Sequence, residues 1–273
     1  MKKKLFSILA LLLMAATGAM AQTTYTVTVK DGTEDAAKWS ADPNPAAAGQ
    51  TVTVTYTGTK KVKSVKAKKK AKPAATVTTA PTATTGDIAA RLNTALVSAG
   101  TAEGGTMMYQ VTTENTQPTS TDGFSATVPT AASLNAIGTY YVWYYVKADD
   151  SHTDSEVSAT AIEVTVNGIA WNSFPTSGWD TSFSQDGITL TAEMIDWEYG
   201  AIEAQHEDGK FTSTVGNFTK IEITADHLSS WSGWTKSGNK ATWTGNASNV
   251  TFRSSDYWDQ TIDRLSSMVF YFQ

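Results

Sequence analysis

The sequence predicts an all-β protein made of several modules. The clearest signal is Ile137–Asp150, in which Tyr, Val and Trp, residues suited to a pleated sheet, follow one another without a break. Short runs of alternating apolar and polar residues, separated by Gly- and Pro-containing turns, recur along the rest of the chain. The chain has 273 residues, more than one small sandwich needs, so we expect two or three modules.

The N-terminus has the pattern of a secretory signal peptide. Lys2–Lys4 form its basic end, Leu5–Ala16 its apolar run, and Ala19–Ala21 a small-x-small cleavage site. We therefore expect residues 1–21 to be removed, leaving a periplasmic, cell-surface or extracellular protein that starts at Gln22. The apolar run is too short for a span of about 20 residues. No second one follows it, so we expect no transmembrane segment after cleavage.

Composition narrows the function classes. The sequence contains no Cys, which excludes disulfides, thiol catalysis, zinc–thiolate sites and iron–sulfur clusters. Its formal net charge of −5 argues against nucleic-acid binding. Lysines cluster in Lys60–Lys72, where we favour a solvated edge strand followed by a linker. The alternative for this segment is adhesion to an anionic surface such as lipopolysaccharide.

The first module is predicted over residues 22–67. Tyr25–Lys30 and Thr51–Tyr56 alternate strictly and indicate strands, while Asp42–Pro45 between them is turn chemistry. The pattern resembles the short β-modules, internalin-type B-repeats among them, that begin many secreted bacterial surface proteins. Residues 68–75, rich in Lys and Ala, are expected to form the linker that follows.

The second module is predicted over residues 76–167. Its strands are expected at Thr76–Thr79, Met107–Thr112, Phe124–Val128, Gly138–Lys147 and Ala161–Val166. The pattern Gly138-x-Tyr140-x-Val142 resembles the start of strand F in immunoglobulin-type sandwiches, in which a corner tyrosine precedes a buried residue by two positions. Val142 would hold that buried place here.

This module also resembles a family of tandem immunoglobulin-like repeats in surface and secreted proteins of Gram-negative gut bacteria. The matching segments are Ser98–Tyr109, Val128–Thr130, Gly138–Tyr144 and Asp149–Ser155. The resemblance implies an immunoglobulin-like β-sandwich and is nearly uninformative about function. Ile88–Val97 departs from the family's usual strand entry, so its register is left open, with a helical turn as one alternative.

The third module, residues 168–273, differs in composition, because it holds seven of the nine Trp residues. Strands are expected at Gly187–Ala192, Phe218–Ala225, Ala241–Thr244, Val250–Phe252 and Met268–Phe272. Alternation turns six side chains inward, namely Ile188, Leu190, Ile221, Ile223, Val250 and Phe252. This spacing predicts a second β-sandwich, with a jelly roll as one possible arrangement. C-terminal domains of mostly unassigned function are often attached to such immunoglobulin-like repeats, and this module resembles them.

One motif resembles an enzyme. Met194–Gly200 resembles the catalytic strand of family-18 chitinases, in which a Glu at the position of Glu198 protonates the glycosidic oxygen. The family's further aspartates would stand at Met194 and Thr191, so the carboxylates that tune this acid are missing. The family's (β/α)₈ barrel also has no counterpart among the predicted strands. We therefore expect neither catalysis nor a cofactor.

We expect no metal site either. His152, His206 and His227 lack metal-ligand spacing. The acidic loop Asp149–Asp154 has three aspartates but lacks the order of a known calcium motif, so we favour a plain hairpin turn over a calcium site.

Aromatic side chains are the remaining functional signal. One set lies on a single side of the long strand: Tyr141, Trp143 and Tyr145. These side chains either stack on sugar rings or on a partner protein, or they take part in cross-strand packing or a domain interface, which is the alternative we favour. A second set lies in small polar loops, and either stacks on a ligand or folds back over the end of the sandwich: Trp231, Trp234, Tyr257 and Trp258.

Together these features predict a non-catalytic exported bacterial binding or adhesion protein. Immunoglobulin-like modules would present a Trp-rich recognition domain, with carbohydrate binding as one expectation and a surface protein as the other partner considered. The alternative is a structural component of a surface or extracellular matrix assembly, joined through exposed β-edges. A glycoside hydrolase that uses Glu198 is retained as a third interpretation for testing.

Overall fold

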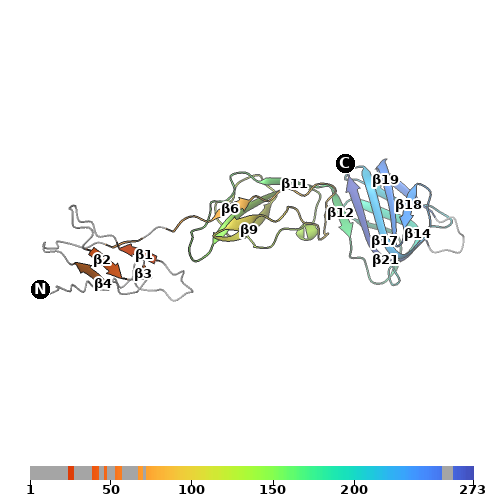
Figure 1. Ribbon diagram of the computed structural model, residues 1–273. Helices are drawn as coiled ribbons and strands as arrows, with labels where there is room; N and C mark the ends of the chain where they lie inside the picture. Colours follow the sequence, from red (N-terminus) through yellow and green to blue (C-terminus); the bar gives the residue numbers. More distant parts are fainter. Residues whose placement is uncertain are drawn as a thin grey trace. The chain divides into compact units, whose positions relative to one another are not determined.

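The computed structural model describes residues 72–253 and 261–273, together with the backbone of five short strands before residue 72. The described protein is all-β, as the sequence predicts, and its one helical element is the 3₁₀ turn η2 (Ala131–Ser133). Figure 1 shows the strands coloured along the chain from red to blue. The chain divides into two units. The first comprises Met1–Ala80, Gly100–Met108 and Tyr145–Val157, and the second comprises Pro81–Ala99, Tyr109–Tyr144 and Ser158–Gln273.

The short N-terminal strands form two small antiparallel sheets. The first has the order β3-β1-β5, from Ala46–Ala47, Thr24–Val27 and Ala67–Lys69, and the second pairs β2 (Trp39–Asp42) with β4 (Thr53–Tyr56). The predicted signal peptide and most of the lysine-rich segment lie outside the described residues. The module boundaries proposed from the sequence stay predictions.

The next strands form a three-stranded sheet and a separate pair. The sheet has the order β11-β10-β9, from Ile162–Val166, Gly138–Ala148 and Gly105–Thr112, and β6 (Thr76–Thr79) pairs with β8 (Thr101–Glu103). Tyr140 is buried and its hydroxyl donates a hydrogen bond to the carbonyl oxygen of Ala136, at 2.9 Å. Val142 is fully buried. Both features are those that the corner-tyrosine pattern predicts.

The strand predicted at Phe124–Val128 is wrong. Only one isolated bridge occurs there, in which the backbones of Ser125 and Tyr109 exchange hydrogen bonds of 2.7 and 2.9 Å. The Ser125 hydroxyl accepts a hydrogen bond from the amide of Thr127, a local bond that competes with a strand ladder. Pro129 follows directly and offers no amide donor.

The C-terminal part forms one large curled sheet. Its main path is β18-β19-β17-β21-β15-β14-β16-β20; β12 pairs with β21, β7 pairs with β12, and β13 pairs with β14. The strands are β7 (Ala89–Ala90), β12 (Gly168–Trp171), β13 (Trp179–Gln185), β14 (Ile188–Asp196), β15 (Ala201–Glu203), β16 (Gly209–Ser213), β17 (Phe218–Leu228), β18 (Trp234–Ser237), β19 (Lys240–Ala247), β20 (Asn249–Phe252) and β21 (Ile262–Phe272).

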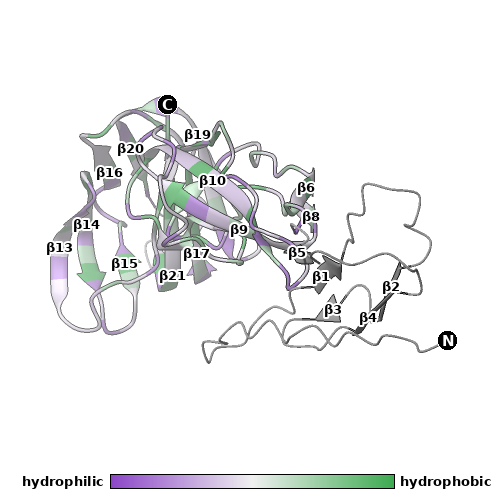
Figure 2. Cartoon of the chain, turned by 90° about the vertical axis from the view of Figure 1, so that its left-hand side faces the viewer, coloured by the Kyte–Doolittle hydropathy of each residue, from purple (hydrophilic) through white to green (hydrophobic). Residues whose placement is uncertain are grey.

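Aromatic rings fill the space that the curled sheet encloses. Phe270 on β21 lies 5.4 Å from Phe211 on β16, and Phe211 lies 5.2 Å from Phe252 on β20. All six side chains predicted to face inward are buried. In Figure 2 the mostly hydrophilic β13 lies beside β14. Among the described residues, no helix has the length and apolar character to span a membrane.

Candidate functional site

Trp231 is buried, with 5% of its surface exposed. Its ring makes an edge contact with Trp234 at 5.1 Å and lies 5.2 Å from Phe252. Its indole N–H donates a hydrogen bond to the hydroxyl of Ser229, at 2.8 Å. The ring therefore closes one end of the core and has no open face for stacking on a ligand. This is the alternative in which the loop aromatics fold back over the end of the sandwich.

Trp234 supports this closure. It is half-buried, its ring lies 6.5 Å from both Phe211 and Phe252, and its indole N–H donates to the carbonyl oxygen of Thr251, at 2.9 Å. The other two loop aromatics of the predicted platform, Tyr257 and Trp258, lie outside the described residues.

The aromatic side chains of β10 also pack inward. Trp143 is 2% exposed and its indole N–H donates to the hydroxyl of Thr112 on β9, at 3.0 Å. Tyr145 is buried as well, whereas Tyr141 is half-buried and lies opposite Glu163 on β11. The packing alternative describes Trp143 and Tyr145.

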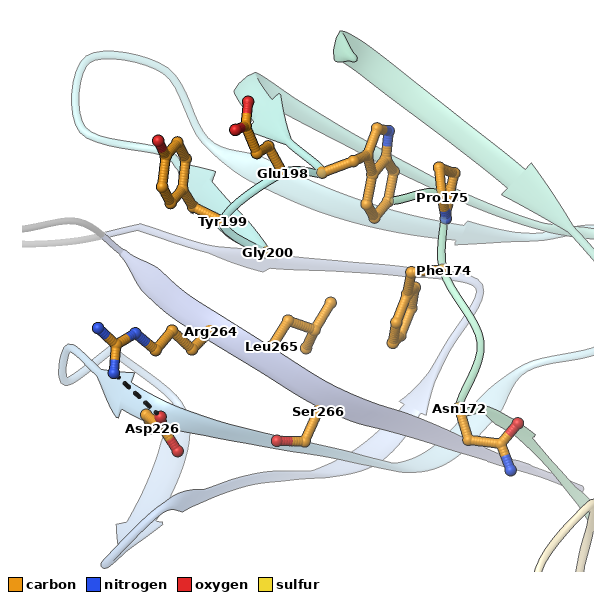
Figure 3. Close-up of a pocket in the computed structure, with 11 residues that line it drawn as sticks. Asn172, Phe174, Pro175, Glu198, Tyr199, Gly200, Asp226, Arg264, Leu265 and Ser266 are labelled. Carbon is orange, nitrogen blue, oxygen red and sulfur yellow. Dashed lines mark ion pairs between the residues drawn. The ribbon is translucent and has the colours of Figure 1, made fainter. Parts of the chain in front are cut away.

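A different part of the C-terminal sheet carries a pocket of about 490 Å³ (Figure 3). The β12–β13 connection and the β14–β15 turn meet the outer ends of β17 and β21 there. The lining residues are Asn172, Phe174, Pro175, Trp197, Glu198, Tyr199, Gly200, Asp226, Arg264, Leu265 and Ser266. This volume lies within the range of small-molecule sites, about 300–1,000 Å³.

A fixed aromatic stack forms one side of the pocket. Trp197 is buried, and Phe174 stacks on it with ring centroids 6.0 Å apart and an angle of 14° between the planes. Phe183 meets the same indole at 4.9 Å. The indole N–H of Trp197 donates to a carboxylate oxygen of Asp180, at 2.7 Å. Packing and this bond to a charged acceptor hold the stack in one orientation.

A tight turn presents Glu198 and Tyr199 at the rim of the pocket. The carboxylate of Asp196 accepts the amide of Glu198, at 3.0 Å, and Gly200 closes the turn at φ +62°. A side chain at Gly200 would come within 3.0 Å of the Leu265 nitrogen, which donates to the Gly200 carbonyl oxygen. Glycine is therefore required by both conformation and space. Tyr199 is left 64% exposed.

A β-bulge shapes the opposite wall. Between β17 and β21 the register shifts after the pair Thr224–Ser267, so that Ala225 pairs with Leu265 and Ser266 is the extra residue. Bulges bend a strand and re-aim its side chains. Arg264, at φ +53°, and Asp226 both project into solvent, with 3.7 Å between guanidinium and carboxylate. Figure 3 shows this pair across the pocket from Glu198 and Tyr199.

The pocket therefore combines aromatic surface with hydrogen-bonding groups of both kinds. Glu198 and Asp226 supply acceptors, and Arg264 supplies donors in a planar fork. Asn172 and Ser266 add groups that both donate and accept. Such a set suits a ligand that alternates hydroxyl groups with apolar C–H faces.

The acidic hairpin uses its carboxylates internally. Asp149 accepts the amide of Ser151 and contacts the imidazole of His152, at 2.8 and 2.7 Å, and Asp154 accepts the amide of Ala148. The bond to His152 is the main reason that the pKa of Asp149 lies below its usual value. Across the described residues, no group of three or more His, Asp or Glu side chains is placed to hold a metal ion.

Sequence reasoning missed most of the pocket. Glu198 and Tyr199 stood in the motif considered for catalysis, but nothing in that motif indicated its neighbours on β17 and β21. Trp179 was missed although Ser177-Gly178-Trp179-Asp180 is as small and polar as the loops that were chosen. Trp179 is 72% exposed, more than any other large hydrophobic side chain among the described residues.

Comparison of the chain with protein-family models, curated proteins and solved structures finds no significant match.

Proposed function

We propose that the protein is a non-catalytic exported binding protein, and that its C-terminal β-domain binds carbohydrate in the pocket beside Tyr199. The observation that carries the proposal is the exposed Tyr199 ring next to Glu198, with Asp226 and Arg264 across the pocket. Large exposed aromatic side chains in soluble proteins mark interaction sites when they adjoin a hollow surface.

Sugar chemistry matches these groups. Each hydroxyl both donates and accepts, so carboxylates and a guanidinium can bind neighbouring hydroxyls of one ring. The C–H faces of the ring offer apolar area to Tyr199 and Phe174. Two carboxylates face one guanidinium, so a neutral sugar fits the pocket better than an acidic one, which would meet repulsion from Glu198 and Asp226.

The proposal is tested with a glycan array on the full mature protein, followed by titration calorimetry of the best ligand. Tyr199→Ala is expected to weaken binding at least tenfold, about 1.4 kcal/mol, because it removes the stacking surface. Trp179→Ala is the matched control, since Trp179 is equally aromatic and exposed but does not line the pocket. Equal losses in both variants, or no binding of any sugar, would contradict the proposal.

The hydrolase interpretation is tested in the same samples. We expect no turnover of chitin-type oligosaccharides, because the residues two and five positions before Asp196 are Met194 and Thr191. Turnover that Glu198→Gln abolishes would replace binding by catalysis.

One observation favours a second function, the assembly of copies through β-edges. Among the described residues β13 pairs with β14 alone, so its other side presents peptide groups without a strand partner there, and Trp179 stands exposed at its start. Thr181→Lys places a charge on this edge and would reduce assembly measured by light scattering. The same variant leaves sugar binding unchanged, which separates the two functions.

A further inference from the structure

A short segment far upstream completes the C-terminal sheet. Ala89 and Ala90, as β7, pair in parallel with Gly168 and Ile169 of β12. The amides of Asn167 and Gly168 both donate to the carbonyl oxygen of Ile88, each at 3.0 Å. Strand β12 in turn pairs with β21. The segment Asp87–Leu92, called the latch below, thus occupies an edge that β12 would otherwise expose.

Apolar contacts hold the middle of the latch. Ala89 forms a buried cluster with Ala170, Val269 and Tyr271, and Leu92 packs against this cluster. Ile88 and Ala90 are 1% and 0% exposed. The alanine side chains are small enough for the latch backbone to approach β12 closely, so the contact is buried as well as hydrogen-bonded.

Asp87 anchors the first end of the latch. Its carboxylate accepts hydrogen bonds from Lys220 on β17, at 2.7 Å, and from the amide group of Asn167, at 2.9 Å. These two bonds, with Lys220 first, lower the pKa of Asp87. The side-chain oxygen of Asn167 accepts the amide of Ile88, at 3.0 Å. The ammonium of Lys220 also lies 4.0 Å from the centre of the Tyr271 ring.

Arg91 anchors the second end. Its guanidinium donates two hydrogen bonds to Asp186, at 2.6 and 2.8 Å, and a third to the carbonyl oxygen of Ala170, at 3.3 Å. Asp186 also accepts the indole N–H of Trp171, at 3.2 Å. The hydrogen bonds from Arg91 are the largest cause of the pKa of Asp186 lying below its usual value. Lysine could not reproduce this planar, two-pronged contact.

The backbone at both ends of this ion pair is unusual. Asp186 has φ +55° and Gly187 φ +73°, as an Asp-Gly hairpin turn between β13 and β14 requires. Arg91 has φ +69° without such a turn sequence. A non-glycine residue in this region is strained and persists where its surroundings determine its conformation fully. The contacts of Arg91 to Asp186 and Ala170, with its amide bond to Ala131, are those surroundings.

We infer that the β12 edge is an acceptor site for the chain's own segment Asp87–Leu92, and that the latch, β12 and the part of β21 paired with β12 open and close as one cooperative unit within the C-terminal sheet. A domain cut at residue 168 would lack a strand. It would expose Ala170, Val269 and Tyr271 and leave Lys220 and Asp186 without their partners in the latch. The recognition domain therefore includes the segment around residue 90, independently of which ligand the pocket binds.

Hydrogen exchange on the full mature protein tests this inference. Arg91→Ala is expected to speed exchange of the amides of β12 and of residues 269–271 by tenfold or more, while β14 and β16 keep their protection. Arg91→Lys, which keeps the charge but not the fork, should give a smaller increase at the same amides. Lys240→Ala is the control, because it removes an ion pair to Glu222 on the same sheet without touching the latch.

A second variant keeps the test decisive if Arg91→Ala does not fold. Asp186→Asn preserves the turn, since asparagine tolerates this φ, and should raise exchange at the same β12 amides. Unchanged β12 exchange in a folded Arg91→Ala or Asp186→Asn protein overturns the inference. So does an increase of equal size in β12, β14 and β16, because it reports general destabilisation rather than opening of the latch.

Discussion

The indole of Trp231 lies between Ser229, Trp234 and Phe252 at one end of the core. Removing it leaves a cavity among rings that cannot collapse easily. Trp231→Ala should therefore cost about 3–5 kcal/mol of unfolding free energy. The melting temperature should fall by roughly 10 °C or more in calorimetry. Trp179→Ala, at a site 72% exposed, should change the melting temperature little. A small effect at Trp231 would mean that its ring is not part of the core.

Tyr271 makes the stability of the protein depend on pH in the alkaline range. Burial, followed by the charges of Glu222 and Asp87, raises its pKa to about 12. The unfolded chain releases this proton near pH 10. The contribution of Tyr271 to stability is thus complete below about pH 10 and is lost as pH rises through about 12.

Urea unfolding at pH 9 and pH 11 measures this loss. The loss of unfolding free energy between pH 9 and pH 11 should be on the order of 1 kcal/mol larger in the native protein than in Tyr271→Phe, which keeps the ring but not the ionisable hydroxyl. The same loss in both proteins would show that Tyr271 titrates as it does in the unfolded chain.

Some strands could be predicted from the sequence and others could not. Strands with alternating apolar residues were found, because Ile188, Leu190, Ile221 and Ile223 can be buried together only on one face of a sheet. Strand β13 was missed because its hydroxyl-rich edge sequence carries no such alternation. Strand β7 was missed because two alanines have no pattern, and its partner lies 79 positions further along the chain.

The pocket could not be predicted from the sequence for a related reason. Its walls come from four separated elements, and the bulge that turns Arg264 and Asp226 into solvent depends on the pairing of β17 with β21. The motif around Glu198 drew attention to one wall but suggested catalysis. Large aromatics in polar loops proved ambiguous, because Trp231 is buried while Tyr199 and Trp179 are exposed.

The ion pairs of the latch make the stability of the sheet depend on pH in the acidic range. Lys220 and Arg91 lower the pKa values of Asp87 and Asp186, respectively. Their contribution is present above the unfolded value of about 3.9 and is lost as pH falls through the lower, folded values. The native protein should therefore lose stability between pH 5 and pH 2.

Denaturant unfolding across that range checks the expectation. The double variant Asp87→Asn/Asp186→Asn should show a shallower loss, because amides do not titrate. Lys240→Ala serves again as the control with an intact latch. An equally steep loss in the double variant would place the acid-sensitive groups elsewhere.

At the scale of the whole molecule, the joint before the second module is open to a protease test. The predicted linker 68–75 is tied down at its end, since Pro73 and Ala75 exchange backbone hydrogen bonds with Thr153, and Lys72 donates to the carbonyl oxygen of Asp150. Brief trypsin treatment should therefore cut between Lys60 and Lys70 and release a resistant fragment that extends to the C-terminus.

Mass spectrometry of the first fragments identifies the sites. Lys147 and Lys220 lie inside strands β10 and β17, so cleavage there requires opening of a sheet and should come late. First cuts at either lysine would mean that the second and third modules are less stable than their hydrogen bonding indicates.

Strand β21 has a further consequence for how the chain reaches its final state. It pairs with β12, β15 and β17, yet it is the last of these strands in the sequence. During synthesis β12, β15 and β17 cannot pair with β21 until β21 has been made, and the latch cannot pair until β12 has been made. Closure of the sheet is therefore a late step, and it joins segments that are far apart in the sequence. A chain that stays open until its final strand arrives is suited to transport across a membrane in an unfolded form. It would also offer chaperones a long interval in which to bind.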